Sequence, residues 1–137
     1  MKLNKKVAVI LGGVLSITIA SGAALRTPPE QVHYTNLKVL PKDISSKELQ
    51  SIMTDDFEDA LGVSCGFCHA NNANGHGLDF ASDAKPEKEI TRVMMRMTLG
   101  INKKYLKIKH PRIGNSMMVV SCYTCHKGAP FPDDVAK

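Results

Sequence analysis

Two stretches of the chain place apolar residues at helical spacing, and each precedes a short cysteine-containing segment. In the first stretch, Ser45 and Glu48 form a capping box, and Gly62 suits the end of a helix. The apolar positions between them recur every three or four residues, at Leu49, Ile52, Met53, Phe57, Ala60 and Leu61. The pattern predicts one amphipathic helix with the acidic residues 55–59 mostly on its solvated face.

A second helix is predicted from about Pro86, which fits a first turn, with Ser82 or Asp83 near its cap. His110-Pro111 predicts its end, since the residue before a proline disfavours helical backbone. One continuous apolar face is formed by Ile90, Val93, Met94, Met97, Ile101 and Tyr105. Residues 70–84 are rich in Asn and Gly and predict a loop between the two helices.

A five-residue motif follows each helix: Cys65-Gly66-Phe67-Cys68-His69 and Cys122-Tyr123-Thr124-Cys125-His126. Cys-x-x-Cys-His is the attachment signature of c-type haem. Two thiols on one helical turn can both bond to the edge of a porphyrin, and the next residue then offers its imidazole to the iron. The motifs predict two covalently bound haem c groups, held by Cys65, Cys68, Cys122 and Cys125, with His69 and His126 as iron ligands.

Other uses of the four cysteines explain less of the pattern. A zinc site would need to close a loop of about 54 positions between Cys68 and Cys122, and a disulfide framework suits an exported chain. Neither explains a histidine directly after each pair. A redox dithiol is expected in an alternating strand and helix context, which is absent from the sequence around both motifs.

Composition favours a small helical domain that packs around its cofactors. The chain has 137 residues, of which 43% are hydrophobic, and it has no Trp and only seven aromatic residues. A core of protein side chains alone would be thin, whereas two haems would fill it. We therefore expect a mainly α fold around two haems, and an apo chain that folds poorly, because cofactor binding stabilises only the folded state.

The N-terminus has the pattern of an export signal. A basic segment, an apolar segment from Val7 to Ala20 and small residues at Ser21–Ala24 predict a signal peptide over residues 1–25, with the haem domain at 26–137. The alternative is an uncleaved anchor, because Val7–Leu25 is just long enough to span a bilayer. Either way we expect a periplasmic or otherwise extracytoplasmic protein, soluble after cleavage or anchored to the inner membrane.

Charge is distributed unevenly along the chain. The formal net charge is +5, but residues 26–84 carry −5 and residues 85–137 carry +7. From these halves we expect the first haem to have the lower reduction potential, and we expect the basic segment Lys103–Arg112 to steer an acidic, membrane-bound redox partner. Nucleic acid is not an expected partner, because aromatic residues do not alternate with basic clusters.

Met53 lies 12 positions before Cys65 on the first predicted helix. A methionine in an apolar stripe is usually core filling, but a haem with a histidine ligand needs a sixth ligand or stays open. A thioether is a common sixth ligand in electron-transfer haems, so Met53 is a candidate iron ligand.

Several segments together resemble one half of the tetrahaem cytochrome subunit of photosynthetic reaction centres. They are Asn36–Leu40, the Met53 helix, both Cys-x-x-Cys-His motifs, Arg92–Thr98 with Ile101-Asn102, and Val120–Gly128. The resemblance implies that a methionine on each preceding helix is the sixth ligand, namely Met53 and Met94, with Met97 as the alternative to Met94. This chain departs from the family in having only one half, and His110 is out of register with the histidine that the family has near this position. A role in photosynthesis therefore does not follow from the resemblance.

These observations predict an electron carrier and not an enzyme. Two six-coordinate irons, His69/Met53 and His126/Met94, leave no room for substrate and reorganise little on a one-electron change. The alternative is a small haem enzyme or sensor, peroxidase-like or gas-binding, in which one iron is open.

Overall fold

The structure is a computed structural model, and it describes residues 32–114 and 117–132, which belong to one compact unit, Gln31–Lys137. The predicted signal or anchor at 1–25 and the domain boundary at residue 26 lie outside the described residues. Within residues 32–114 and 117–132, no helix is both long enough and apolar enough to cross a bilayer.

The first predicted helix is confirmed as three consecutive helical segments. They are α2 (Ser46–Ser51), η1 (Ile52–Glu58) and α3 (Asp59–Leu61), and the middle one is a wider π-helix. The Ser45 hydroxyl accepts a hydrogen bond from the Glu48 amide at 3.2 Å, as the capping box predicts. Gly62 ends the helix with a left-handed backbone (φ 63°), a conformation that glycine adopts at little cost.

A short hairpin follows the first motif. The motif itself forms the one-turn helix α4 (Cys65–Cys68), and β1 (Ala70–Asn71) then pairs antiparallel with β2 (Leu78–Asp79). The sequence predicts only a loop here, whereas the structure has two short strands of two residues each within it. The hairpin is closed by the Asn72 amide, which donates to the Gly77 carbonyl at 3.0 Å.

The second predicted helix is α5 (Pro86–Lys104), with Pro86 in its first turn as expected. Lys85 occupies the N-cap position, two residues after Asp83, whose carboxylate pairs with Lys38 and Arg92. The prediction for the other end of the helix is wrong. The helix ends at Lys104, six residues before His110, where Lys107 turns the chain with φ 60° and the Ile108 amide bonds back to the Asn102 carbonyl.

The face that α5 buries is not its apolar face. Its buried residues are Arg92, Met95, Thr98 and Asn102. The predicted apolar face is largely exposed, with Val93 at 52%, Met94 at 42% and Met97 at 51%. Exposed apolar residues in a continuous row indicate a surface that packs against something besides this chain.

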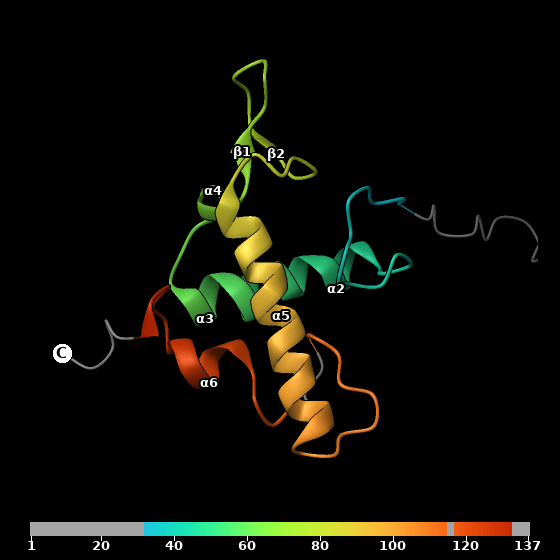
Figure 1. The fold of residues 1–137 in the computed structure, drawn as a ribbon. Coiled ribbons are helices and arrows are strands. Elements are labelled where there is room, and N and C mark those ends of the chain that lie inside the picture. The colour runs from blue at the N-terminus through green and yellow to red at the C-terminus, as the bar shows by residue number, and fades with distance from the viewer. Residues whose placement is uncertain (1–31, 115–116, 133–137) are drawn as a thin grey trace, which may run out of the picture. The chain divides into compact units, whose positions relative to one another are not determined.

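The protein core is small, as the composition suggests. Its central cluster is formed by Leu40, Ile44, Ile52, Met95 and Ile113, so it includes residues of both the first helix and α5, and Figure 1 shows α5 crossing the first helix. The second motif forms α6 (Cys122–His126), which packs against α3 and η1. The described fold is therefore mainly helical with little strand, as predicted.

Candidate haem-binding sites

One cavity of about 650 Å³ collects the four residues predicted to bind the first haem. Met53 reaches it from η1, the Cys65 and Cys68 thiols reach it from α4, and His69 lies directly after them. This volume is in the range of small-molecule and cofactor sites. Residues 12 or more positions apart along the chain thus line a single space.

The cavity wall is mostly apolar, and most of its aliphatic and aromatic side chains come from three parts of the chain. The first helix contributes Leu49, Phe57 and Leu61, the segment before it contributes Val39 and Leu40, and α5 contributes Met95. Several of these also contact the core cluster, so the wall is continuous with the core. A flat apolar ligand would bury these side chains from water, which stabilises the complex through the hydrophobic effect.

His69 is a suitable ligand for iron. Its Nδ1 atom is buried and has no hydrogen-bond partner among the residues that the structure describes, which is uncommon for a buried nitrogen. Its ring meets the Phe80 ring edge-on, with 5.0 Å between centroids. Burial lowers the pKa of His69, and the cations Lys88 and Arg92 lower it further. The imidazole is therefore held in the neutral form that binds metals.

The thiols of the first motif are held in the protonated form. Cys65 Sγ donates to Glu58 Oε1 at 3.0 Å, and this hydrogen bond raises the pKa of Cys65. Burial raises the pKa of Cys68, whose Sγ lies 3.8 Å from the Thr91 hydroxyl. Raised pKa values are the opposite of what a reactive redox dithiol needs, so the geometry disfavours that alternative.

The residues of the first site fit a c-type haem. Two thiols at the motif spacing, a neutral imidazole and a thioether all border one apolar cavity. These are the attachment groups and iron ligands that such a haem uses, and a buried unpartnered imidazole nitrogen is consistent with a metal nearby.

The second motif is ordered by its own capping interactions. The Ser121 amide donates to the Thr124 hydroxyl at 3.0 Å, and Lys127 ends α6 with φ 50°. Burial raises the pKa of Cys122 to about 11, and Asp56 contributes to the rise. This capping box was not predicted from the sequence, although Ser121 and Thr124 have the spacing that indicates one.

His126 has the outer contact that a haem ligand usually makes. Its Nδ1 lies 3.0 Å from the Ala129 carbonyl oxygen, and because a carbonyl can only accept, Nδ1 carries the proton. The other ring nitrogen is then free to bind a metal. For His69, a backbone hydrogen bond with Phe80 partly opposes the lowering of its pKa, although Nδ1 has no partner at hydrogen-bond geometry in the described part of the chain.

Asn102 joins α5 to the segment that enters the second motif. It is fully buried, and its Oδ1 accepts from the Val119 and Val120 amides at 2.9 and 3.2 Å. Its Nδ2 donates to the Thr98 and Val120 carbonyls at 2.9 and 2.7 Å. The three bonds to Val119 and Val120 were missed at the sequence level, because an asparagine in a helical pattern does not reveal partners 17 and 18 positions away.

Met94 and Met97, the candidate sixth ligands of the second haem, lie on the exposed face of α5. Met97 borders a shallow groove with Ile101 and Tyr105, while the first cavity contains neither methionine. The structure therefore gathers the ligand set of the first site around one cavity and leaves the methionines of the second site on an open surface.

The remaining described histidines are exposed. His76 lies in the hairpin loop, His110 borders a surface groove after α5, and His33 borders the mouth of the first cavity. Nor do the described residues contain a cluster of three or more His, Cys, Asp or Glu side chains that could hold a metal ion by themselves.

The fold and the first cavity thus define a small, mainly helical domain with two haem-attachment motifs. Residues 17–137 match the family described as "Photosynthetic reaction centre cytochrome C subunit", and the chain belongs to this family. Membership of a cytochrome c family implies covalently bound haem c.

Two curated proteins show the same relationship. The chain is 34% identical over 87 residues to cytochrome c-554 of Chloroflexus aurantiacus, covering 64% of this chain and 19% of that protein. It is 32% identical over 71 residues to the photosynthetic reaction center cytochrome c subunit of Rubrivivax gelatinosus, covering 52% and 16%. The chain thus spans less than a fifth of each relative. No solved structure matches significantly.

Proposed function

We propose that this chain is an extracytoplasmic one-electron carrier with two haem c groups, one at each motif. Cys65 and Cys68 attach the first haem and Cys122 and Cys125 attach the second. Each iron is six-coordinate, with His69 and Met53 at the first haem and His126 and Met94 at the second. A bound haem supplies the reversible change between ferric and ferrous iron.

The observation that carries this proposal is the shared cavity of Met53, Cys65, Cys68 and His69. A thioether and an imidazole bordering the same cavity fill both axial positions of one iron, which leaves no position for substrate. A Met/His ligand pair raises the reduction potential, so the chain holds a relatively high-potential haem.

At the second site, the support comes from His126 and from the exposed face of α5. The Nδ1 contact of His126 orients its ring, and Met94 lies in a row of apolar side chains that a haem would cover. Met97, one turn later on the same face, is the alternative ligand.

A specific observation also favours the second candidate, a haem enzyme or sensor with one open iron. Met94 is 42% exposed, and the structure does not gather it with His126 around one cavity as it gathers Met53 with His69. Any open iron is therefore the second one. Carbon monoxide distinguishes the two functions, because it binds a reduced five-coordinate iron and not a six-coordinate one.

The test is a haem count on the exported protein, by pyridine haemochrome spectrum and intact mass. The proposal expects two haems per chain, one after the double change Cys65→Ala/Cys68→Ala, and two in a Ser64→Ala control. A wild-type chain with fewer than two haems would contradict it.

For the partner, we propose an acidic redox protein at the membrane. Lys103, Lys104 and Lys107 are exposed around the groove that Met97 and Tyr105 border, which offers positive charge beside apolar surface. The resemblance to a reaction centre subunit supports a membrane-bound partner. Cleavage or retention of residues 1–25 then decides whether the carrier diffuses or stays anchored.

A further inference from the structure

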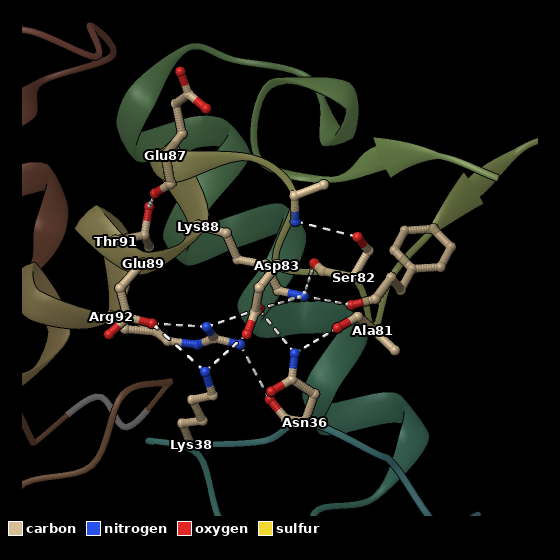
Figure 2. Close-up of polar contacts among 12 residues, drawn as sticks. Asn36, Lys38, Ala81, Ser82, Asp83, Glu87, Lys88, Glu89, Thr91 and Arg92 are labelled. Atoms are coloured by element: carbon tan, nitrogen blue, oxygen red, sulfur yellow. Dashed lines mark hydrogen bonds and ion pairs between the residues drawn. The ribbon is translucent and has the colours of Figure 1, made fainter. Parts of the chain in front are cut away.

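A network of six charged side chains adjoins the first cavity, which three of its cations line, and Figure 2 shows its members Lys38, Asp83, Lys88, Glu89 and Arg92. Arg92 Nη1 lies 2.9 Å from Asp83 Oδ1 and 2.8 Å from Glu89 Oε2, and Lys38 Nζ lies 2.7 Å from Asp83 Oδ2. The members are Lys38, Asp83, Lys88, Glu89, Arg92 and Arg96. It joins the segment before the first helix to the start of α5.

Two of the four cations of this network are more buried than its anions, whereas Lys38 and Arg96 are 46% and 49% exposed. The side chains of Arg92 and Lys88 are 7% and 11% exposed, whereas those of Asp83 and Glu89 are 39% and 51% exposed. Water screens the exposed carboxylates more effectively than it screens the buried cations. Seen from the protein interior, the network is therefore positive.

Lys88 has the surroundings of a charged ammonium group. Its Nζ donates to the Phe80 and Ser82 carbonyls at 2.9 and 2.7 Å and lies 3.5 Å from Asp83 Oδ1. These three acceptors match the three N–H donors of an ammonium group. Arg92 is similarly satisfied, since its Nη2 also donates to the Asn36 carbonyl at 3.2 Å.

The cavity wall includes three cations and one carboxylate. Lys38, Lys88 and Arg92 border it, together with Glu58, whereas Asp83 and Glu89 do not. Lys88 and Arg92 come from the part of the sequence that also contains the second motif. The positive half of the sequence thus contributes its buried cations to the first site.

Conversely, the negative half of the sequence contributes an acidic residue to the surroundings of the second motif. Asp56, from the negative half, lies on η1, and η1 packs against α6, the helix of the second motif. Asp56 is half-buried, and its charge contributes to the raised pKa of Cys122 in α6. A helix that packs against the second motif therefore carries a carboxylate of the first half.

We propose that Lys88 and Arg92 give the first haem the higher reduction potential, and that Asp56 gives the second haem the lower one. Positive charge stabilises ferrous iron relative to ferric iron, and negative charge does the reverse. Electrons then pass from the second haem to the first. This order rests on the proposed dihaem function, and it reverses the order expected from the net charges of the two sequence halves.

The carboxylates of a haem do not change the sign of this effect. Lys88 and Arg92 are the cations available to neutralise them at the first site. Removing either cation leaves more uncompensated negative charge near the iron, which again favours the ferric state.

The experiment is a spectroelectrochemical titration of the full-length protein with both haems attached. Met53→His identifies the first haem, because exchanging a thioether for a second imidazole lowers the potential of that haem. We expect the higher midpoint to move in this variant. Lys88→Gln and Arg92→Gln should each lower the ferrous-to-ferric ratio of the same haem by up to about tenfold at fixed potential, which is about 59 mV.

The controls separate charge from structure. Lys88→Arg and Arg92→Lys keep the charge and should restore most of the wild-type midpoint. Arg112→Gln removes an exposed cation that pairs with Glu48 away from the cavity and should leave both midpoints unchanged. Asp56→Asn should raise the lower midpoint alone.

Two results would overturn the proposal. One is that Met53→His moves the lower wild-type midpoint. The other is that Lys88→Gln, with both haems attached, leaves the higher midpoint unchanged. If Arg92→Gln does not fold, the midpoints of Lys88→Gln and Met53→His still test the proposed order of reduction potentials. A chain with fewer than two haems would instead refute the proposed function, so the two failures are distinguishable.

Discussion

Gly62 and Gly128 lie in direct backbone contact. A Cβ atom placed on Gly62 would overlap the carbonyl oxygen of Gly128 and lie 3.0 Å from its carbonyl carbon. The Gly128 amide also donates to the Ala60 carbonyl at 2.9 Å. This contact joins the end of the Met53 helix to the end of the second motif, so the two haem-attachment segments depend on one glycine pair.

Gly62→Ala should destabilise the whole domain. The substitution places a side chain at φ 63°, which costs roughly 1–2 kcal/mol, and it also forces two backbone segments apart. We expect a loss of at least about 3 kcal/mol of unfolding free energy in chemical denaturation. Gly75→Ala is the matched control, since Gly75 has φ 77° with open space around it. Equal losses in the two variants would show that the Gly128 contact contributes nothing.

Met53→Ala should convert one haem to a five-coordinate, high-spin form that binds carbon monoxide when reduced. The methionine-to-iron charge-transfer band of that haem should disappear, because the thioether is removed from the cavity shared with His69. The matched control is Met118→Leu, which keeps the volume of a partly buried methionine that packs against the core and does not line this cavity. An unchanged spectrum in Met53→Ala would rule out this ligand.

At the second haem, Met94→Ala and Met97→Ala distinguish two ligands one turn apart on α5. We expect only Met94→Ala to abolish the methionine band of the second haem, leaving the first unchanged. If Met97→Ala abolishes it instead, the alternative ligand is correct. If neither does, and carbon monoxide already binds the reduced wild-type protein, the open-iron function is correct.

Asn102→Ala should loosen the second motif and cost roughly 2–4 kcal/mol of unfolding free energy. The change leaves the Val119 and Val120 amides without their acceptor at a partly buried site, and an unsatisfied buried group costs about 1–3 kcal/mol. Asn74→Ala is the control, because Asn74 makes one similar bond to the His76 amide in an exposed loop. Denaturant midpoints measure both, and similar losses would contradict the assigned role of Asn102.

Acid should weaken the charged network through Asp83. The hydrogen bond from Lys38 is the largest of the contacts that hold the pKa of Asp83 far below its ordinary value of 3.8. A carboxyl group whose pKa is lower in the folded state stabilises the fold above its ordinary pKa, and this stabilisation is lost as the pH falls further.

The stability difference between wild type and Asp83→Asn should therefore be full at neutral pH and should shrink below about pH 4. Thermal unfolding across this pH range measures it. Asp43→Asn, an exposed position outside the network, is the control. A difference between wild type and Asp83→Asn that does not change with pH would contradict the assignment.

Electron exchange with an acidic redox protein should depend on the exposed lysines at the end of α5. The double change Lys103→Gln/Lys104→Gln should lower the second-order rate at low salt and flatten its decline as salt rises, because exposed charges are screened over about 10 Å at 0.1 M. Lys42→Gln/Lys47→Gln, also exposed, is the control. A neutral partner should show no such difference.

Local patterns predicted the elements well where the physical cause is itself local. Ser45 and Glu48 set the start of the first helix, Gly62 ends it, and Pro86 begins α5. The end of α5 was predicted six residues too late. The chain leaves the helix at Tyr105 and turns at Lys107 with φ 60°, and the His110-Pro111 pair does not predict this earlier turn.

Which face of α5 is buried could not be predicted from periodicity. Its apolar row, including Val93 and Met97, is exposed, whereas Arg92 and Asn102 are buried. Periodicity reports that apolar residues share a face and does not report what covers that face. The polar residues are buried because carboxylates and backbone groups from elsewhere in the chain satisfy them.

By itself, the sequence determined the chemistry of this protein: two Cys-x-x-Cys-His motifs, a methionine on the helix before each, and membership of a cytochrome family that follows from those segments. Attachment chemistry depends on spacing within one helical turn, which a sequence records directly. Only the tertiary structure decided that Met53 and His69 border one cavity and that Lys88 and Arg92 border it too. Electrostatic effects act through space, so the charge near each site depends on which segments pack together and not on their order along the chain.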